Sequence, residues 1–234
     1  MHHQYVINEY MANFSFNEKV AILSLASGIM FADDKAKMSE RSSFEKIQKK
    51  LDQTIPVSLL TVEEAVKKVA KFDKLTQLRI LLMIQSVAIT DEQFGQYERK
   101  MANNIANQLG ITFEMPKASV EVVIGLLYKF AAIDGTVPQD EKDLLIELLG
   151  GNVAAYNNIV DNAKSFNLEN AIQQISALKE VDKSLVGFYI QQIISADSII
   201  DDDEAELIKK VFETTGIDAL CLPEKTGFWK RIFG

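Results

Sequence analysis

Carboxylates recur in this sequence at a fixed spacing, at points where one apolar helical run ends and another begins. The frame is an aspartate, an apolar residue three positions later, and a glutamate seven positions after the aspartate. Three copies carry both acids: Asp134 with Glu141, Asp197 with Glu204, and Asp91 with Glu98. Paired carboxylates at such a spacing can bind a cation, serve as an acid and a base, or stabilise helix ends.

The glutamates have a structural explanation that needs no ion. Each follows a plausible N-cap by three residues, with Pro138, Gly95 and Asp201 as the caps. Each therefore fits the N3 position of a capping box, or complements the positive end of the helix dipole. Pro138 also suits position N1, which would move the cap to Val137. For the glutamates alone, this structural interpretation is favoured.

The aspartates are harder to explain by helix stability. Asp134 and Asp197 follow apolar runs directly, so they are expected at helix C-termini. There the helix dipole disfavours an anion by roughly a few tenths of a kcal/mol. Two alternatives offset this cost: the aspartate caps the following helix through an Asx-type hydrogen bond, or a cation lies between the aspartate and the glutamate.

The second alternative predicts one site in the second half of the chain. Two tight junctions packed about a pseudo-twofold axis would bring four carboxylates together: Asp134, Glu141, Asp197 and Glu204. Oxygen donors without histidine or cysteine suit a hard divalent cation, namely Ca²⁺, Mg²⁺ or Mn²⁺. Asp91 and Glu98 are weaker candidates for a second site. The loop is not an EF-hand, because it lacks alternating acids and the final glutamate.

The junction also carries a family resemblance. The run Ala-x-Asp-Gly-x-Val-x-x-x-Glu spans 132–141, and 195–204 repeats it as SADSIIDDDE. On this motif the chain resembles the TerB family of tellurite-resistance and stress-associated proteins, well over 117–217 and less closely over 16–111. The resemblance implies an all-helical fold with an internal repeat, a metal-linked acidic junction and no enzymatic activity. Ser198 and Glu92 depart from it, since glycine is expected there.

A fourth copy of the frame has lost both acids. Met38 keeps the apolar position, while Lys35 and Ser42 stand where the acids would be. If the first half pairs its junctions in the same way, the Lys35 ammonium would face Asp91 and Glu98 in place of an ion. A metal is therefore expected in the second half and not in the first.

Helical periodicity runs through the whole chain and predicts an all-α protein. The last expected helix of each half has the same length, since Gly110 follows Phe94 by sixteen positions, Gly216 follows Ile200 by sixteen, and each glycine precedes an isoleucine. We therefore expect two tandem TerB-like helical domains, each with an internal helix-junction-helix repeat, over 1–112 and 113–222. An aromatic and basic tail follows over 223–234. A continuous helical solenoid is the alternative.

Capping residues and glycines mark the expected boundaries. Helices are expected at about 16–31, 39–51, 62–72, 74–89, 95–109, 117–133, 138–149, 153–165, 168–179, 183–196 and 201–215.

Charge and composition restrict the class of partner. Residues 1–112 hold 14 basic and 13 acidic side chains, whereas 113–234 hold 11 and 20, a net charge of -9. Such a field repels nucleic acid and attracts cations or basic protein partners. The lone Cys221 fits a reducing compartment, and we expect neither a signal peptide nor a membrane span. A cytoplasmic protein that acts through protein partners is expected.

No arrangement for nucleophilic catalysis is evident. The two histidines are His2 and His3, and no phosphate-binding loop occurs. The leading hypothesis is a non-catalytic, cation-binding module in a stress response. The alternatives are a metal-free interaction scaffold and, less favoured, a metal-dependent hydrolase. The segment Phe228–Phe233 is expected to pack within the protein or its oligomer, or to bind a partner, in preference to peripheral membrane contact.

Overall fold

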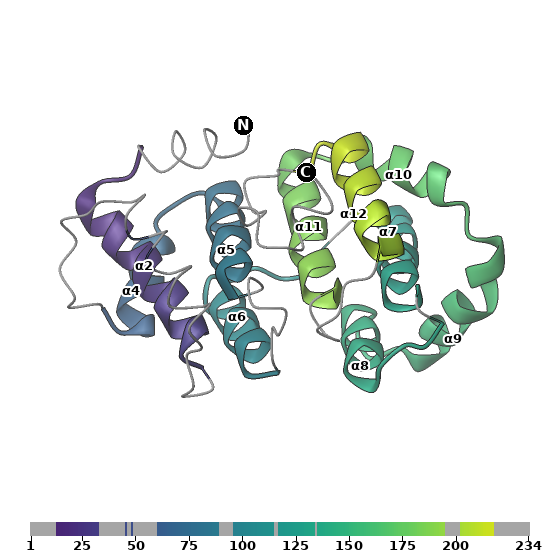
Figure 1. Cartoon of the computed structure of the whole chain (residues 1–234), viewed down its shortest axis with the longest axis horizontal. Helices are drawn as coiled ribbons and strands as arrows, with labels where there is room; N and C mark the ends of the chain where they lie inside the picture. Colours follow the sequence, from purple (N-terminus) through teal and green to yellow (C-terminus); the bar gives the residue numbers. More distant parts are fainter. Residues whose placement is uncertain are drawn as a thin grey trace.

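Our computed structural model describes residues 13–32, 45, 48, 60–88, 96–114, 117–133, 135–194 and 202–217. Within these ranges the regular structure is helical and no strand occurs, which confirms the all-α class (Figure 1). The helices are α2 (Phe16–Met30), α4 (Val62–Val69), α5 (Lys74–Ala88), α6 (Gln96–Gln108), α7 (Lys117–Ala131), α8 (Gln139–Leu148), α9 (Val153–Asn162), the 3₁₀ turn η2 (Ala163–Ser165), α10 (Leu168–Ser176), α11 (Glu180–Ile194) and α12 (Asp202–Thr215).

The helices begin where side-chain caps satisfy the first backbone N–H groups. Thr61 and Glu64 form a capping box at α4, and Ser15 forms one with Glu18 at α2. Asp73 accepts a hydrogen bond from the Thr76 backbone at 3.0 Å and so caps α5. These three helices begin at the residues expected from the sequence, namely 16, 62 and 74. The helix expected at 39–51 lies mostly outside the described residues, and α11 begins three residues earlier than predicted.

Two glycines end the helices that were expected to match. Gly110 follows α6 and Gly216 follows α12, with φ of 63° and 66°. Only glycine adopts this left-handed conformation without strain. At α6 the Lys74 ammonium also donates hydrogen bonds to the backbone carbonyls of Leu109 and Gly110, at 2.7 and 2.6 Å. A cation is favourable at this negative end of the helix dipole.

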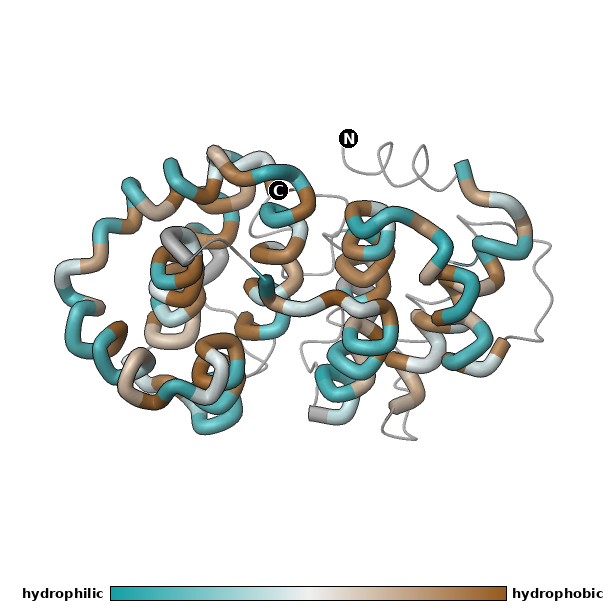
Figure 2. Tube along the Cα trace, turned by 180° about the vertical axis from the view of Figure 1, so that it is seen from behind, coloured by the Kyte–Doolittle hydropathy of each residue, from teal (hydrophilic) through white to brown (hydrophobic). Residues whose placement is uncertain are grey.

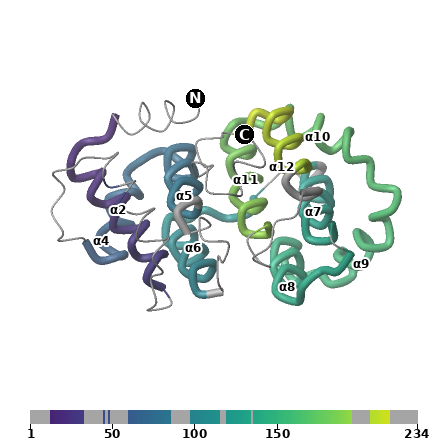
Figure 3. The backbone as a smooth tube through the Cα atoms, in the orientation of Figure 1, coloured from purple at the N-terminus to yellow at the C-terminus, as the bar shows by residue number. Residues whose placement is uncertain are grey.

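Helices of the two halves correspond in order and length. Shifting α5 by 106 positions gives the bounds of α11, and both have 15 residues. The same shift relates the starts of α4 and α10, and of α6 and α12, while α2 and α7 also have 15 residues each. Figure 3 shows the chain passing through one group of helices before the other. The division at residue 112 into two homologous domains stays a prediction.

The two halves pack against each other through α5 and α11. Arg79 lies 3.6 Å from Glu180, Leu82 lies beside Gly187, and Gln85 accepts a 2.6 Å hydrogen bond from Gln192. The contacts advance in the same direction along both helices, so α5 and α11 run parallel, as the view in Figure 1 also shows. Their C-terminal ends therefore lie at the same end of the molecule.

Hydrophobic residues form one continuous core through both halves. In α11 every residue from Ser184 to Ile194 is buried, which fits its central position. Figure 2 shows hydrophobic segments along the central helices and many hydrophilic residues on the outer arc. Among the described residues, no helix has both the length and the apolar character needed to cross a membrane.

Tyr189 lies in the part of this core that α11 contributes. Its ring packs edge-on against Phe113 and Phe188, with centroid distances of 5.2 and 5.1 Å. Burial, with a smaller contribution from the negative charge of Glu147, raises the pKa of Tyr189 to about 12. The neutral phenol is therefore favoured in the folded protein.

This shift predicts a loss of stability at alkaline pH. Because the folded pKa exceeds the unfolded value of about 10, the contribution is fully present below pH ~10 and is lost as the pH rises to about 12. Two pKa units correspond to about 3 kcal/mol. Urea unfolding across this range measures it. Tyr189→Phe, which has no phenol to ionise, should show a shallower decline; equal slopes for both proteins would contradict the assignment.

Candidate functional site

The structure describes some of the predicted acidic residues but not others. Glu141 in α8 and Glu98 in α6 are described together with their side chains. Glu204 lies in α12, but its side chain is outside the described set. Asp134, Asp197 and Asp91 also lie outside the described residues. The predicted gathering of Asp134, Glu141, Asp197 and Glu204 therefore stays a prediction.

Glu98 and Glu141 share an unusual environment for a carboxylate. Each is only 3% exposed, although each lies in the first turn of its helix. Glu18 and Glu64, which act in capping boxes, keep their capping hydrogen bonds at the exposed surface. Burial of a charged group is costly unless partners or a metal compensate for lost hydration. The two glutamates therefore differ in setting from the capping residues of this chain.

At α8 the capping-box explanation fails for a chemical reason. Pro138 is the N-cap, not position N1, and its side chain makes no capping hydrogen bond. A proline has no backbone N–H, so the N3 glutamate cannot accept the reciprocal hydrogen bond that completes a capping box. The dipole of α8 still favours the Glu141 carboxylate. The contribution of Glu141 to the helix start therefore includes this electrostatic effect but no complete capping box.

An ion pair joins the two first turns that hold these glutamates. The Arg99 guanidinium, next to Glu98 in sequence, binds the Asp140 carboxylate, next to Glu141. The Arg99 side chain is only 12% exposed. The ion pair thus links the starts of α6 and α8, and each of these first turns holds one buried glutamate from a different half of the chain. The sequence pattern does not predict this contact, and it makes Glu98 only a weaker candidate than Glu141.

Two tyrosines and a lysine surround the first turn of α8. The rings of Tyr128 in α7 and Tyr156 in α9 meet edge-on, with centroids 6.2 Å apart. The Lys142 ammonium lies 5.7 Å from the Tyr156 ring centroid, within cation–π range. Burial, then the charges of Tyr128 and Glu141, raise the pKa of Tyr156. The Glu141 carboxylate is thus close enough to act electrostatically on this phenol.

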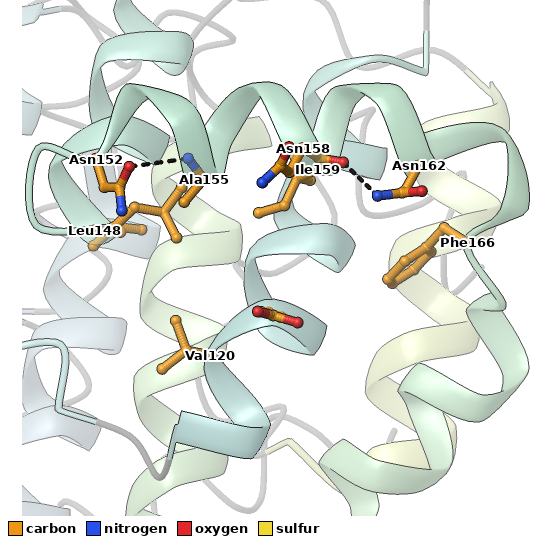
Figure 4. A pocket seen from close by; sticks show the side chains of 10 residues that line it. Val120, Leu148, Asn152, Ala155, Asn158, Ile159, Asn162 and Phe166 are labelled. Carbon is orange, nitrogen blue, oxygen red and sulfur yellow. Dashed lines mark hydrogen bonds between the residues drawn. The ribbon is translucent and has the colours of Figure 1, made fainter.

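A separate groove of about 800 Å³ lies between α7, the end of α8, and α9. Figure 4 shows the labelled side chains of α9 along one side and Val120 of α7 opposite them, with Phe166 near one end. Its lining residues are Val120, Glu121, Leu148, Leu149, Asn152, Ala155, Asn158, Ile159, Asn162 and Phe166. Neither Glu98 nor Glu141 lines it. Nothing in the sequence pattern distinguished these residues from an ordinary helix surface.

Within the described part of the chain, no group of three or more histidine, cysteine, aspartate or glutamate side chains is arranged to hold a metal. Three of the four predicted ligands have no described side chain, so this finding covers Glu141 alone. Comparison with protein-family models, curated proteins and solved structures found no match to the chain.

Proposed function

We propose that this protein is a non-catalytic TerB-like helical module that binds a divalent cation at its acidic helix junctions and acts through protein partners in a cytoplasmic stress response. The burial of Glu98 and Glu141, at the same position of two separate copies of the repeated frame, is the observation that carries the proposal. By contrast, Glu64, which stabilises the start of α4 in a capping box, is exposed.

Electrostatics supports a cation at this end of the molecule. A buried carboxylate loses hydration, and a nearby positive charge favours its ionised form. Hard oxygen donors select Ca²⁺, Mg²⁺ or Mn²⁺ over softer metals. The parallel packing of α5 and α11 also places the C-termini that precede Asp91 and Asp197 at one end of the helix pair. These features favour Asp134, Glu141, Asp197 and Glu204 as ligands, with Asp91 and Glu98 as a second set.

The metal-free scaffold is the second candidate, and a specific contact favours it. Arg99 supplies a positive charge from within the protein, beside Glu98 and bound to Asp140. In that case the ion pair links α6 to α8 without a metal, and the protein acts through its surface alone. The hydrolase alternative has less support, because the described groove does not include Glu98 or Glu141.

Metal analysis and cation-dependent melting separate the two candidates. Protein purified without chelator is expected to contain a divalent metal, and added cation at 100 times its Kd should stabilise the apo-protein by about 2.7 kcal/mol. Asp134→Asn, Asp197→Asn and Glu141→Gln should each reduce this stabilisation, because each removes a negative ligand. The readout is the melting temperature with Ca²⁺, Mg²⁺ or Mn²⁺ against chelator.

Glu213→Gln is the matched control, since Glu213 is an exposed glutamate of α12 outside the repeated frame. It should retain the full response to cation. A metal-free protein whose melting temperature ignores all three cations would overturn the proposal in favour of the scaffold. An equal loss of response in Glu213→Gln would show that the cations act through general surface charge.

A further inference from the structure

The groove between α7 and α9 combines an apolar floor with hydrogen-bonding amides. Its apolar side chains come from all three helices and from Phe166, whereas its amides come from α9 and its cap. Asn152 accepts a hydrogen bond from the Ala155 backbone, and the Asn162 amide donates to the Asn158 carbonyl, as Figure 4 shows. The side chain of Asn158 itself is exposed at the rim. Such a surface suits a short peptide with an apolar face.

The charge of the groove restricts the occupant. Among the lining side chains that the structure describes, Glu121 is the charged one, and its charge is negative. Residues 113–167, which build it, hold 8 acidic and 4 basic side chains. A basic peptide is therefore favoured over an acidic one, because opposite charges attract at the rim and like charges repel.

One segment of this chain has the complementary pattern. Phe228, Trp229, Ile232 and Phe233 follow the spacing i, i+1, i+4 and i+5, which forms one face of a helix. Lys230 and Arg231 fall on the other face. The segment is thus amphipathic, with an aromatic face for an apolar floor and two cations for an acidic rim.

The length of chain between the last described residue and Phe228 bears on whether the tail can bind within its own chain. The described chain ends at Ile217, which packs against Gly187 of α11. The ten residues between Ile217 and Phe228 span up to about 36 Å when extended. A folded domain of about 100 residues has a radius of gyration of about 13 Å, so this length is more than twice that radius. We propose that the segment Phe228–Phe233 docks into the groove between α7 and α9 of the same chain.

Trp229 reports on this docking, because it is the only tryptophan in the sequence. In the full-length protein its fluorescence is expected to be blue-shifted and protected from a soluble quencher. Asn158→Arg adds bulk and a positive charge at the groove rim, so it should shift the emission to the red and increase quenching. Excess of a peptide with the sequence of residues 218–234, carrying Trp229→Phe, should displace the tail and give the same red shift.

Asn157→Arg is the matched control, since Asn157 is the exposed neighbour on α9 that does not line the groove. It should leave the emission unchanged, and circular dichroism confirms that both variants stay folded. A fully quenched Trp229 in the wild type would overturn the proposal, as would identical spectra for the two variants. Protection that increases with protein concentration would show that the tail occupies a second copy, and would equally overturn docking within one chain.

Discussion

Replacing Phe188 by alanine is expected to lower the free energy of unfolding by about 3–5 kcal/mol. Phe188 is among the largest fully buried side chains, and its ring packs edge-on against Tyr189 at 5.1 Å. Truncation removes buried apolar contacts and leaves a cavity, which the helix pair α5 and α11 cannot close without moving the two halves. Urea denaturation followed by circular dichroism measures the change.

Two comparisons make this result specific. Phe188→Leu keeps more of the buried volume and should cost well under half as much. Phe16→Ala removes the same aromatic side chain from a site that is 45% exposed and should have a small effect. A small loss for Phe188→Ala, equal to that of Phe16→Ala, would show that α11 is not the centre of the core.

The glutamine pair between α5 and α11 predicts strongly non-additive substitutions. Gln85 and Gln192 are 0% and 1% exposed, and one hydrogen bond joins them. Within the described part of the chain, the Gln85 Nε2 and Gln192 Oε1 atoms have no hydrogen-bond partner. The pair is therefore buried but only half satisfied, an arrangement that stabilises less than apolar packing.

Gln85→Met or Gln192→Met alone should each cost about 1–3 kcal/mol, because the remaining amide stays buried and loses its partner. The double variant should be nearly as stable as the wild type, or more stable, since both amides are then removed. A double-mutant cycle in urea gives the coupling free energy. Additive losses in the double variant would show that the two side chains do not depend on each other.

The sequence predicted the local ends of helices better than their packing. Thr61 and Glu64 mark a helix start because the cap is local chemistry, and the same holds for Gly110 at a helix end. The pairing of α5 with α11 could not be read in this way. Both helices are apolar on nearly every side, so their periodicity does not say which face meets which neighbour.

For the candidate site too, the sequence predicted local features but not packing. The spacing of acids identified Glu141 and Glu98, but it could not distinguish a buried glutamate from the exposed Glu64, because all three fit position N3 of a helix. Burial depends on what packs over the first turn, and for α8 those neighbours include Tyr156 of the next helix. The contact between Arg99 and Asp140 spans 41 positions and has no local signal.

The parallel packing of α5 and α11 also has a consequence during synthesis. Gln85 emerges from the ribosome 107 residues before its partner Gln192. At a synthesis rate of about 5–20 residues per second, the apolar surface of α5 is made roughly 5 to 20 s before the helix that covers it. Until then the nascent first half presents a hydrophobic surface to the cell, and this interval is when chaperones would protect the chain from aggregation.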